Sequence, residues 1–271
     1  RLTRSPNIKT LEEINTTNNH PMNNQNTLDK MRQMKLYGMY DAFTSAIQLG
    51  LSNTLTQDQF IAQLVDHEYD DRKQRKYKRL VTNAKFRYQA SLEDVLYAED
   101  RNLDKLQLHR LAECTFIDKA ENILITGSTG VGKSYLASAL GYHACSLDYK
   151  VGYYNTSRLI SSLKLARAAG TYIRETNRIQ RMELIILDDY GLQSLDKEAR
   201  MILMDIMEDR HERKSTMITS QLPVSAWYEI IGEKTHADAI MDRLTYNSHR
   251  IELKGESLRR KSSKTSTEIN A

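Results

Sequence analysis

The second half of the chain alternates between short strand-like segments and longer segments of helical periodicity. Residues 184–187 form a continuous apolar run, as expected of a strand buried on both faces of a sheet, and further strand-like segments lie at 123–126, 151–155, 216–219 and 249–253. Apolar residues recur at helical steps between them, which predicts helices over 133–147, 157–169, 171–181 and about 196–213. This order predicts an α/β fold with a mostly parallel sheet and helices on both faces.

The region before the first of these strands shows only helical periodicity. Apolar residues recur at three-to-five-residue steps from Leu28 to Ile47, and a second helical segment opens near Thr56. No proline occurs between Leu51 and Leu222, so helices in that stretch can run without interruption. We therefore predict a small, all-helical N-terminal domain in front of the α/β domain.

These patterns divide the chain into four parts. Residues 1–26 are rich in Asn and Thr, which predicts a segment that is disordered or foreign to the native protein, with Met22 as a candidate natural start. The helical N-terminal domain is predicted over 27–95 and the α/β domain over 96–254. Residues 255–271 form a basic, polar tail.

Composition narrows the class of protein. The 271 residues carry a formal net charge of +4, and 40% of them are hydrophobic. No stretch of about eighteen apolar residues is present, so we expect no membrane span. The chain begins without an apolar signal core, and its two cysteines, Cys114 and Cys145, have no metal-binding spacing. We therefore predict a cytoplasmic protein whose cysteines are small buried residues.

A glycine-rich segment follows the first predicted strand. It reads Gly127-Ser128-Thr129-Gly130-Val131-Gly132-Lys133-Ser134, and Tyr135 comes next in the predicted helix. Between a strand and a helix, such a loop directs backbone N–H groups and the positive end of the helix dipole at a phosphate. Lys133 is expected to reach the β- and γ-phosphates, and Ser134 to offer its hydroxyl to Mg²⁺. Residues 127–135 are therefore predicted to bind ATP or GTP.

Two acids follow the continuously apolar strand. Asp188 comes directly after it and is expected to hold the Mg²⁺ that Ser134 also contacts. Asp189 is expected to orient and deprotonate the attacking water. The alternative is that both acids merely end a strand in a turn with Gly191.

Polar residues also follow the next strand, at Thr219, Ser220 and Gln221. In a parallel sheet this edge faces the same crevice as the phosphate loop, so one of the three is expected to contact the γ-phosphate or the attacking water. Ser220 is the preferred candidate, and capping of the turn is its alternative role.

Arg243 precedes the last strand-like segment and is a candidate arginine finger, a residue that stabilises charge on a neighbouring subunit's nucleotide. Its alternative role is an ion pair with Asp238 or Asp242.

Basic residues come in two groups. From Arg72 to Arg87 the chain has eight basic residues and no acid, and helical spacing puts four of them on nearly one face, suited to DNA phosphates: Arg72, Arg75, Lys76 and Arg79. The second group lies on the helices predicted over 157–181 and contains Lys164, Arg167, Arg174 and Arg178. A solvated charged surface is the alternative for both groups. No base-reading motif is visible, so contacts are expected mainly with the DNA backbone.

The motifs together resemble a known family. Besides the phosphate loop, they are Leu-Ile-Ile-Leu-Asp-Asp-Tyr-Gly at 184–191, Ile-Thr-Ser-Gln-Leu-Pro at 218–223, Asp-Arg-Leu at 242–244 and Arg-Ile-Glu-Leu-Lys-Gly-Glu-Ser at 250–257. In this order they resemble the IstB-type transposition helper ATPases. These are AAA+ P-loop NTPases related to the DnaC helicase loaders and the DnaA initiators. The resemblance covers about 28–260.

The resemblance implies roles for single residues. Lys133 and Ser134 match the Walker A pair, Asp188 matches the Walker B magnesium residue, and Asp189 stands where most AAA+ proteins have glutamate. Ser220 matches the sensor-1 region, and Arg243 matches the arginine finger. The short tail after Lys254 implies that the usual helical lid is absent or vestigial and that the sensor-2 arginine is missing or displaced to Arg259.

The resemblance also implies a function. It is an ATPase that requires Mg²⁺, forms a homo-oligomer on double-stranded DNA, selects or remodels target DNA and stimulates an IstA-type transposase, with hydrolysis controlling disassembly. The helical domain over 27–95 would then serve DNA binding or oligomerisation. Two rivals are a DnaC-like helicase loader that binds single-stranded DNA and a scaffold that binds ATP but scarcely hydrolyses it. A small-molecule kinase is disfavoured, because the chain leaves little room for a substrate domain.

Overall fold

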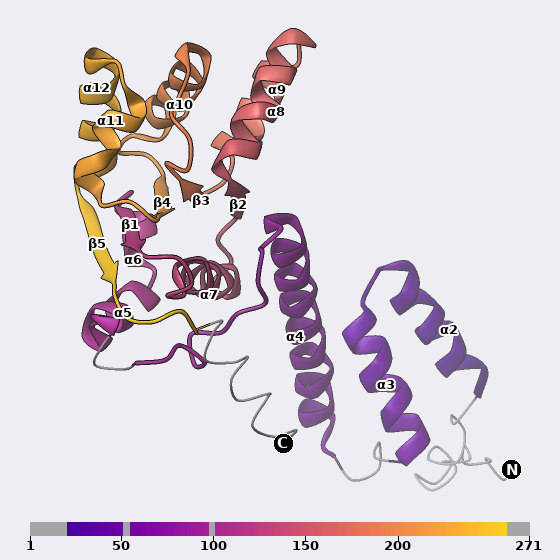
Figure 1. The fold of residues 1–271 in the computed structure, drawn as a ribbon. Helices are drawn as coiled ribbons and strands as arrows, with labels where there is room; N and C mark the ends of the chain where they lie inside the picture. The colour runs from indigo at the N-terminus through magenta and orange to yellow at the C-terminus, as the bar shows by residue number, and fades with distance from the viewer. Residues whose placement is uncertain (1–20, 51–54, 98–100, 259–271) are drawn as a thin grey trace, which may run out of the picture. The chain divides into compact units, whose positions relative to one another are not determined.

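The first of two compact units is helical. The computed structural model describes residues 21–50, 55–97 and 101–258, and the chain divides between Lys76 and Tyr77. The first unit contains α2 (Pro21–Gln33), α3 (Tyr37–Leu49) and the first part of α4 (Gln57–Ala84) (Figure 1). Residues 21–26 are thus helical, although their sequence pattern indicated an unstructured segment. Proline suits the first turn of a helix, because its φ is already helical and its missing N–H needs no partner there.

A buried carboxylate joins α3 to α4. Glu68 is 5% exposed, and it accepts hydrogen bonds from the N–H groups of Gly38 at 2.9 Å and Met39 at 3.2 Å. N–H groups in the first turn of a helix have no partner within the helix, so Glu68 caps α3. Arg72 Nε lies 2.6 Å from Glu68, and Arg75 is a second ion-pair partner at 3.7 Å. Two cations predicted to bind DNA therefore stabilise the helical unit itself.

The second unit is built on a sheet of five parallel strands in the order β2-β3-β4-β1-β5. The strands are β1 (Asn122–Gly127), β2 (Val151–Asn155), β3 (Leu184–Tyr190), β4 (Ser215–Ser220) and β5 (Ser248–Leu253). Its helices are α5 (Lys105–Ala112), α6 (Thr115–Asp118), α7 (Lys133–Ser146), α8 (Thr156–Ala168), α9 (Tyr172–Gln180), α10 (Lys197–Arg210), the short η3 (Val224–Ala226), α11 (Trp227–Ile231) and α12 (Lys234–Thr245). The predicted elements of the α/β region are confirmed to within a few residues at their ends.

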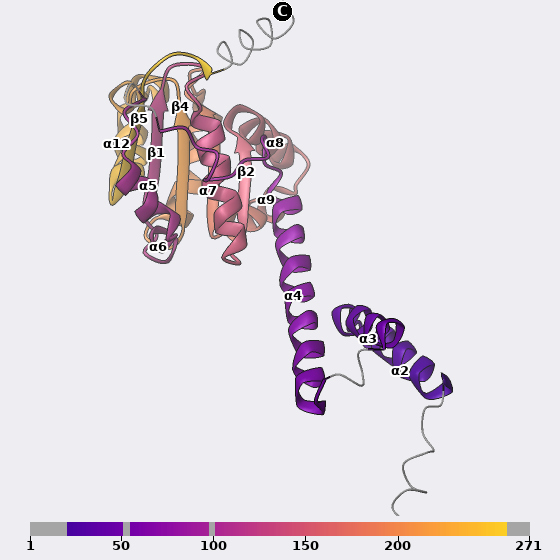
Figure 2. The ribbon, with the colours of Figure 1, turned by 90° about the horizontal axis from the view of Figure 1, so that it is seen from below.

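Helices cover both faces of the sheet (Figures 1 and 2). Ile123 and Ile125 of β1 pack in the core on the face of α5, α6 and α7, whereas Leu124 packs in the core on the face of α8 to α12. Successive side chains of a strand point to opposite faces, so a strand covered on both sides must be apolar throughout. In the described part of the chain, no helix has the length and apolar character needed to cross a membrane.

The division between the units differs from the predicted boundary at 95 and 96. Leu80 and Ala84 of α4 are buried in the same core as Leu140 of α7, and Val95 of the following segment joins them. The end of α4 and the segment after it therefore belong to the α/β unit. The sequence pattern of α4 is helical throughout and gives no sign of this change in surroundings.

Arg210, the last residue of α10, ties together the starts of two strands. It is 2% exposed, and its guanidinium donates to Met182 O at 3.0 Å, Glu183 O at 3.2 Å and Thr216 Oγ1 at 3.2 Å. Burial lowers the pKa of Arg210 to about 9, so the group is still charged at neutral pH. Backbone oxygens, rather than an acid, compensate this buried charge.

Arg210→Leu should destabilise the protein by about 3 kcal/mol, because it leaves several buried carbonyl groups without a donor. Urea unfolding followed by the fluorescence of Trp227, the single tryptophan, measures the effect. Arg213→Ala removes an exposed arginine near the same end of the sheet and should change stability by less than about 0.5 kcal/mol. Equal stability of the Arg210 and Arg213 variants would contradict this role of Arg210.

Candidate functional site

The loop between β1 and α7 has a backbone that only glycine adopts easily. Gly127, Gly130 and Gly132 have φ values of 144°, 85° and 97°, in the region that L side chains rarely enter. Space is limited as well, since a Cβ added to Gly130 would lie 2.1 Å from Ser257 Oγ. The segment after β5 covers the loop here, where the N–H of Leu258 donates to Gly130 O at 3.0 Å.

The same loop concentrates hydrogen-bond donors. Within the described ranges, none of the backbone N–H groups of residues 128–132 donates a hydrogen bond. Lys133 is 7% exposed, and its Nζ donates to Gly127 O at 2.7 Å and to Ser128 O at 2.8 Å. These N–H groups, the ammonium group and the N-terminus of α7 together form a site suited to an anion.

Asp188 is the polar centre beside the loop. It is fully buried at the end of β3, and Ser134 Oγ donates to its Oδ1 at 2.7 Å. Thr219 donates to the same oxygen and Tyr153 to the other. Burial, followed by the hydrogen bond to Asp188, raises the pKa of Tyr153, so its hydroxyl keeps its proton. A carboxylate facing a serine hydroxyl is the kind of all-oxygen pair that suits Mg²⁺, so these residues fit that ion.

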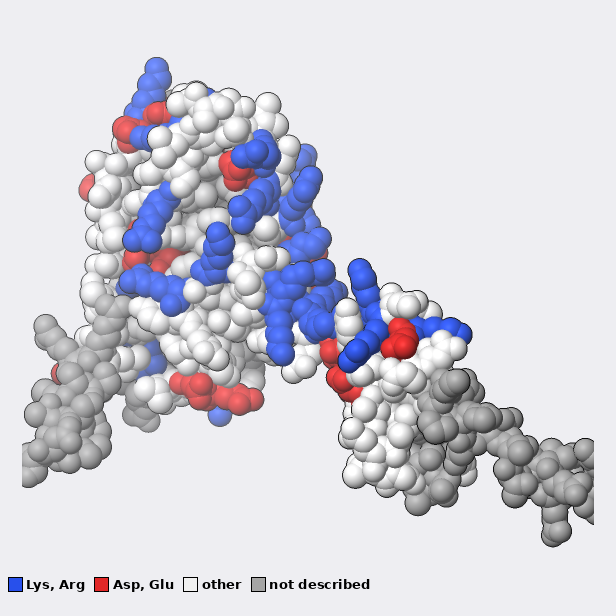
Figure 3. Space-filling model, turned by 90° about the vertical axis from the view of Figure 1, so that its right-hand side faces the viewer, with Lys and Arg blue, Asp and Glu red and all other residues white. Residues whose placement is uncertain are grey.

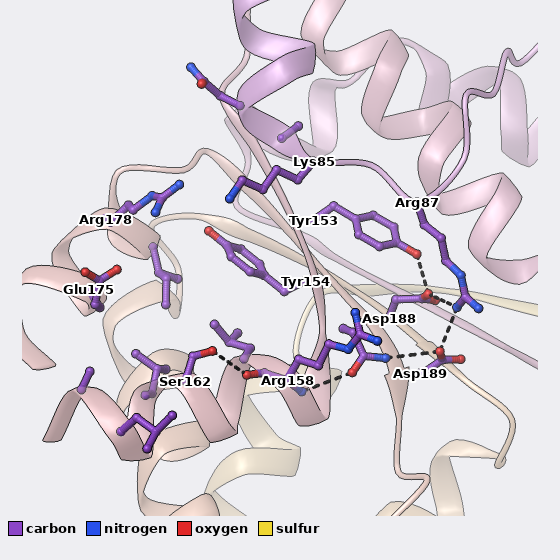
Figure 4. A pocket seen from close by; sticks show the side chains of 18 of the residues that line it. Lys85, Arg87, Tyr153, Tyr154, Arg158, Ser162, Glu175, Arg178, Asp188 and Asp189 are labelled. Atoms are coloured by element: carbon purple, nitrogen blue, oxygen red, sulfur yellow. Dashed lines mark hydrogen bonds and ion pairs between the residues drawn. The ribbon is translucent and has the colours of Figure 1, made fainter. Parts of the chain in front are cut away.

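Asp189 leaves the regular strand conformation. Its φ is 58°, and the pairing of β3 with β4 shifts register between Leu187 and Tyr190. Its Oδ2 accepts hydrogen bonds from Arg87 Nη1 at 3.0 Å and from Asn155 Nδ2 at 3.4 Å. The same Arg87 nitrogen lies 3.2 Å from Asp188 Oδ2 (Figure 4).

The sequence indicated Arg87 only as the end of a basic stretch. Arg87 and Asp188 lie 101 residues apart, and no motif connects them. Burial by itself lowers the pKa of Arg87, but the nearby Tyr88, Asp188 and Asp189 outweigh it and raise the pKa overall. Arg87 therefore stays charged and neutralises part of the acid pair.

Thr219 and Ser220 have different partners. Thr219 Oγ1 contacts Asp188, whereas Ser220 donates to Tyr190 O at 2.8 Å and accepts from the N–H of Leu222 at 3.1 Å. Ser220 therefore caps the turn, the alternative role considered for it, and Thr219 is the residue that reaches the acids. Neighbouring side chains of a strand point to opposite faces, which separates the two.

Gln221 also lies close to the nucleotide loop. Its Oε1 accepts a hydrogen bond from Thr129 Oγ1 at 2.7 Å. The sequence indicated the right group of three residues. The direction in which each side chain points decides which of them contacts Asp188 and which contacts the loop.

Arg243 lies at the opposite edge of the sheet. Asn122, the first residue of β1, donates from Nδ2 to Arg243 O at 2.9 Å, whereas the phosphate loop follows the last residue of β1. At a rise of about 3.3 Å per residue, the strand separates the two by about 16 Å. The guanidinium pairs with Glu208, not with Asp238 or Asp242, and in the described part of the chain its buried Nε has no partner.

Lys and Arg side chains gather on the face of the α/β unit drawn in Figure 3. Acids of the same unit already pair with three of the predicted DNA contacts, namely Lys164, Arg167 and Arg174. Arg79 and Arg178 form no side-chain ion pair or hydrogen bond within the described ranges. Charge along the sequence therefore did not distinguish cations held by acids from cations available to a ligand.

A cavity of about 280 Å³ adjoins the phosphate loop. Its walls are mainly apolar and include Leu96, Leu103, Tyr135 and Leu258. Arg101 fixes one wall, because its Nη1 donates to Leu96 O at 2.7 Å. An apolar cavity next to an anion site can hold the flat base of a nucleotide whose phosphates occupy the loop.

Comparison with known proteins identifies the family. The sequence profile described as IstB-like ATP binding protein matches residues 29–266. The chain belongs to this family. This IstB-like chain is 48% identical, over 234 residues, to the insertion sequence ATP-binding protein y4pL of Sinorhizobium fredii, which covers 86% of this chain and 96% of that protein.

Solved structures support the fold of this IstB-like chain. AMPPCP-bound DnaA from Aquifex aeolicus matches with a TM-score of 0.56 and 20% identity, covering 68% of this chain and 56% of that chain. The DnaC helicase loader matches with a TM-score of 0.52 and 19% identity, covering 65% of this chain and 99% of that chain. Such likeness confirms the predicted AAA+ fold. The predictions of an absent lid and of Arg259 as sensor 2 fall on 259–271, outside the described residues.

Thr219→Val should weaken Mg²⁺ binding to the IstB-like site. The change nearly keeps the side chain's volume but removes the hydroxyl that orients Asp188, and loss of such a supporting contact lowers metal affinity by about tenfold or more. Titration of Mg²⁺ against a fluorescent ATP analogue measures the affinity. Thr126→Val, at the end of β1, is the matched control and should leave it unchanged. Equal Mg²⁺ affinity in the two variants would contradict the role of Thr219.

Proposed function

We propose that this protein is a Mg²⁺-dependent ATPase that assembles on double-stranded DNA and acts with an IstA-type transposase. The observation that carries the proposal is the 2.7 Å hydrogen bond between Ser134 and Asp188, beside a loop whose N–H donors have no partner among the described residues. Lys133 binds the β- and γ-phosphates, and Ser134 and Asp188 hold Mg²⁺, which when bound neutralises phosphate charge. Asp189 orients the attacking water and accepts its proton.

The choice of ATP over GTP rests on the similarity of this chain to known proteins. The family description and the name of the y4pL relative both specify ATP binding, and the matched DnaA structure holds an ATP analogue. The cavity beside Tyr135 is the place for the base. Its apolar walls suit the flat face of adenine and require no particular hydrogen-bonding edge.

Assembly is inferred from the position of Arg243. About 16 Å of strand separates it from the phosphate loop of its own chain, which is beyond the reach of an arginine side chain. A subunit packed head to tail can bring Arg243 to its neighbour's γ-phosphate, where a guanidinium stabilises the charge of the transition state. Arg243 would then exchange its ion pair with Glu208 for the phosphate.

The DNA and the transposase are inferred from the relatives, whose names place them in insertion sequences. Within such an element, a DNA-bound ATPase can select or remodel the target DNA and stimulate the transposase that joins the ends. ATP between subunits stabilises the assembly, and hydrolysis controls its disassembly. A helicase loader on single-stranded DNA is the second candidate, because DnaC has the same fold.

The test compares ATP hydrolysis and particle size in the presence of duplex DNA, of single-stranded DNA and of neither. We expect duplex DNA to produce large particles and to raise hydrolysis about tenfold or more, because assembly completes each site with a neighbour's arginine. Sedimentation velocity and phosphate release measure the two quantities. A preference for single-stranded DNA would favour the loader, and assembly without hydrolysis would favour a scaffold; either result contradicts the proposal.

A further inference from the structure

A large groove opens next to the acid pair. It has a volume of about 1020 Å³ and is lined by the end of α4, the end of β2, helices α8 and α9, and the two acids near the end of β3. Both acids therefore line this groove, and Asp188 also contacts Ser134 beside the phosphate loop. The groove is larger than the apolar cavity beside the loop, and the proposed nucleotide site does not use it.

Cations without acid partners line the groove. Lys85, Arg158 and Arg178 come from three separate elements and extend into it (Figure 4). All three are exposed, and within the described ranges their side chains form no ion pair or hydrogen bond. Glu175 is the one acid on the wall away from the β3 end, and it pairs with Arg174. The groove therefore carries a surplus of positive charge that is available to a ligand.

The fourth cation of the groove, Arg87, is already engaged. Its Nη1 lies 3.2 Å from Asp188 Oδ2 and 3.0 Å from Asp189 Oδ2, and its side chain lines the groove and is 44% exposed. A carboxylate oxygen that accepts a charge-assisted hydrogen bond from a guanidinium is occupied by that contact. As long as Arg87 and Asn155 hold Asp189 Oδ2, this oxygen is not available to position a water molecule.

We propose that the groove binds the phosphate backbone of a nucleic acid, and that Arg87 moves from Asp189 to a backbone phosphate when the strand enters. Lys85, Arg158 and Arg178 supply the other phosphate contacts. The inference rests on the proposed function and deepens it, since it names the residues through which DNA regulates the catalytic acid. Binding of DNA frees Asp189, and by reciprocity, release of Arg87 from Asp189 tightens DNA binding.

Two features favour a polymer over a small phosphate compound. The cations follow the groove from the acid pair at β3 to Arg178 on α9, rather than converging on one point (Figure 4). The volume of about 1020 Å³ is at the upper end for pockets that enclose a small ligand, about 300–1,000 Å³. Such an open groove with spaced cations suits a phosphodiester chain.

A double-mutant cycle tests the exchange of Arg87, with duplex affinity measured by fluorescence anisotropy without nucleotide or Mg²⁺. Asp189→Asn should tighten duplex binding about fivefold, since DNA no longer competes with the acid for Arg87. In an Arg87→Ala background the same change should have no effect. In an Arg213→Ala background, which removes an equal charge at the far edge of the sheet, the fivefold gain should remain.

Equal gains in the Arg87 and Arg213 backgrounds would overturn the exchange, because Asp189→Asn would then act only through net charge. The nucleotide is absent, so coupling between Arg87 and Asp189 cannot come from a contact with ATP. Failure of the wild-type chain to bind duplex DNA even with ATP and Mg²⁺ would instead contradict the proposed function, and failure confined to the nucleotide-free chain would overturn the exchange alone. A wild-type chain that binds duplex without the coupling leaves that function intact and removes only this inference.

The salt dependence of binding tests the groove. Changing Lys85, Arg158 and Arg178 together to Ala should reduce the slope of log affinity against log salt by about 2 to 3 for duplex DNA, roughly one for each lost phosphate contact. The matched control changes Lys119, Arg213 and Lys214 at the opposite edge of the sheet and should keep the slope. Equal slopes in the two triple variants would overturn the assignment of these three cations to backbone phosphates. A reduced slope seen only with single-stranded DNA would overturn their assignment to duplex DNA.

Discussion

Parallel pairing of β3, β4 and β1 brings the ends of three strands to one edge of the sheet, and the nucleotide site depends on that pairing. The phosphate loop follows β1, and Asp188 and Thr219 lie near the ends of β3 and β4. The buried carboxylate of Asp188 is stable there because hydroxyl groups from neighbouring elements donate to both of its oxygens. The same sheet holds Arg243 at its other edge. Under the proposed function, two chains would then be needed to bring Arg243 to a phosphate loop.

The fold could be predicted because its signals are local. Continuous apolar runs, the glycine loop and the helical periodicity each lie within a few neighbouring residues, and the observed elements follow them closely. The loop, Asp188 and the polar end of β4 were predicted to meet because parallel strands end at a common edge. The role of Ser220 stays a prediction, but composition does not contain which face of β4 each side chain occupies, and it is Thr219 that contacts Asp188.

Long-range partners are the part that the sequence did not reveal. Arg72 and Arg75 belong to a run of eight basic residues without an acid, yet both pair with the buried Glu68. Arg87, at the end of the same run, pairs with Asp188 and Asp189 instead. Helical spacing predicts a shared face but not what covers that face. As a result, the unpaired cations of the groove are better candidates for DNA contacts than the cations that acids already hold.

In the proposed mechanism, a neighbouring subunit and DNA both control the nucleotide site. A neighbouring subunit would supply Arg243 at the phosphates, and DNA in the groove would withdraw Arg87 from Asp189. Hydrolysis would then require both assembly and DNA, which suits an ATPase whose turnover ends a DNA-bound state. In the present structure Arg87 Nη1 lies 3.0 Å from Asp189 Oδ2, which is the contact that this control would break.

The most direct test of the shared site mixes two inactive variants on duplex DNA. Asp189→Asn lacks the base but keeps the arginine, and Arg243→Ala lacks the arginine but keeps the base, so each alone should hydrolyse ATP at least about a hundredfold more slowly than the wild type. An equal mixture should recover roughly a quarter of the wild-type rate, because one interface in about four joins an intact base to an intact arginine. Mixed particles of normal size that recover no hydrolysis would contradict the account.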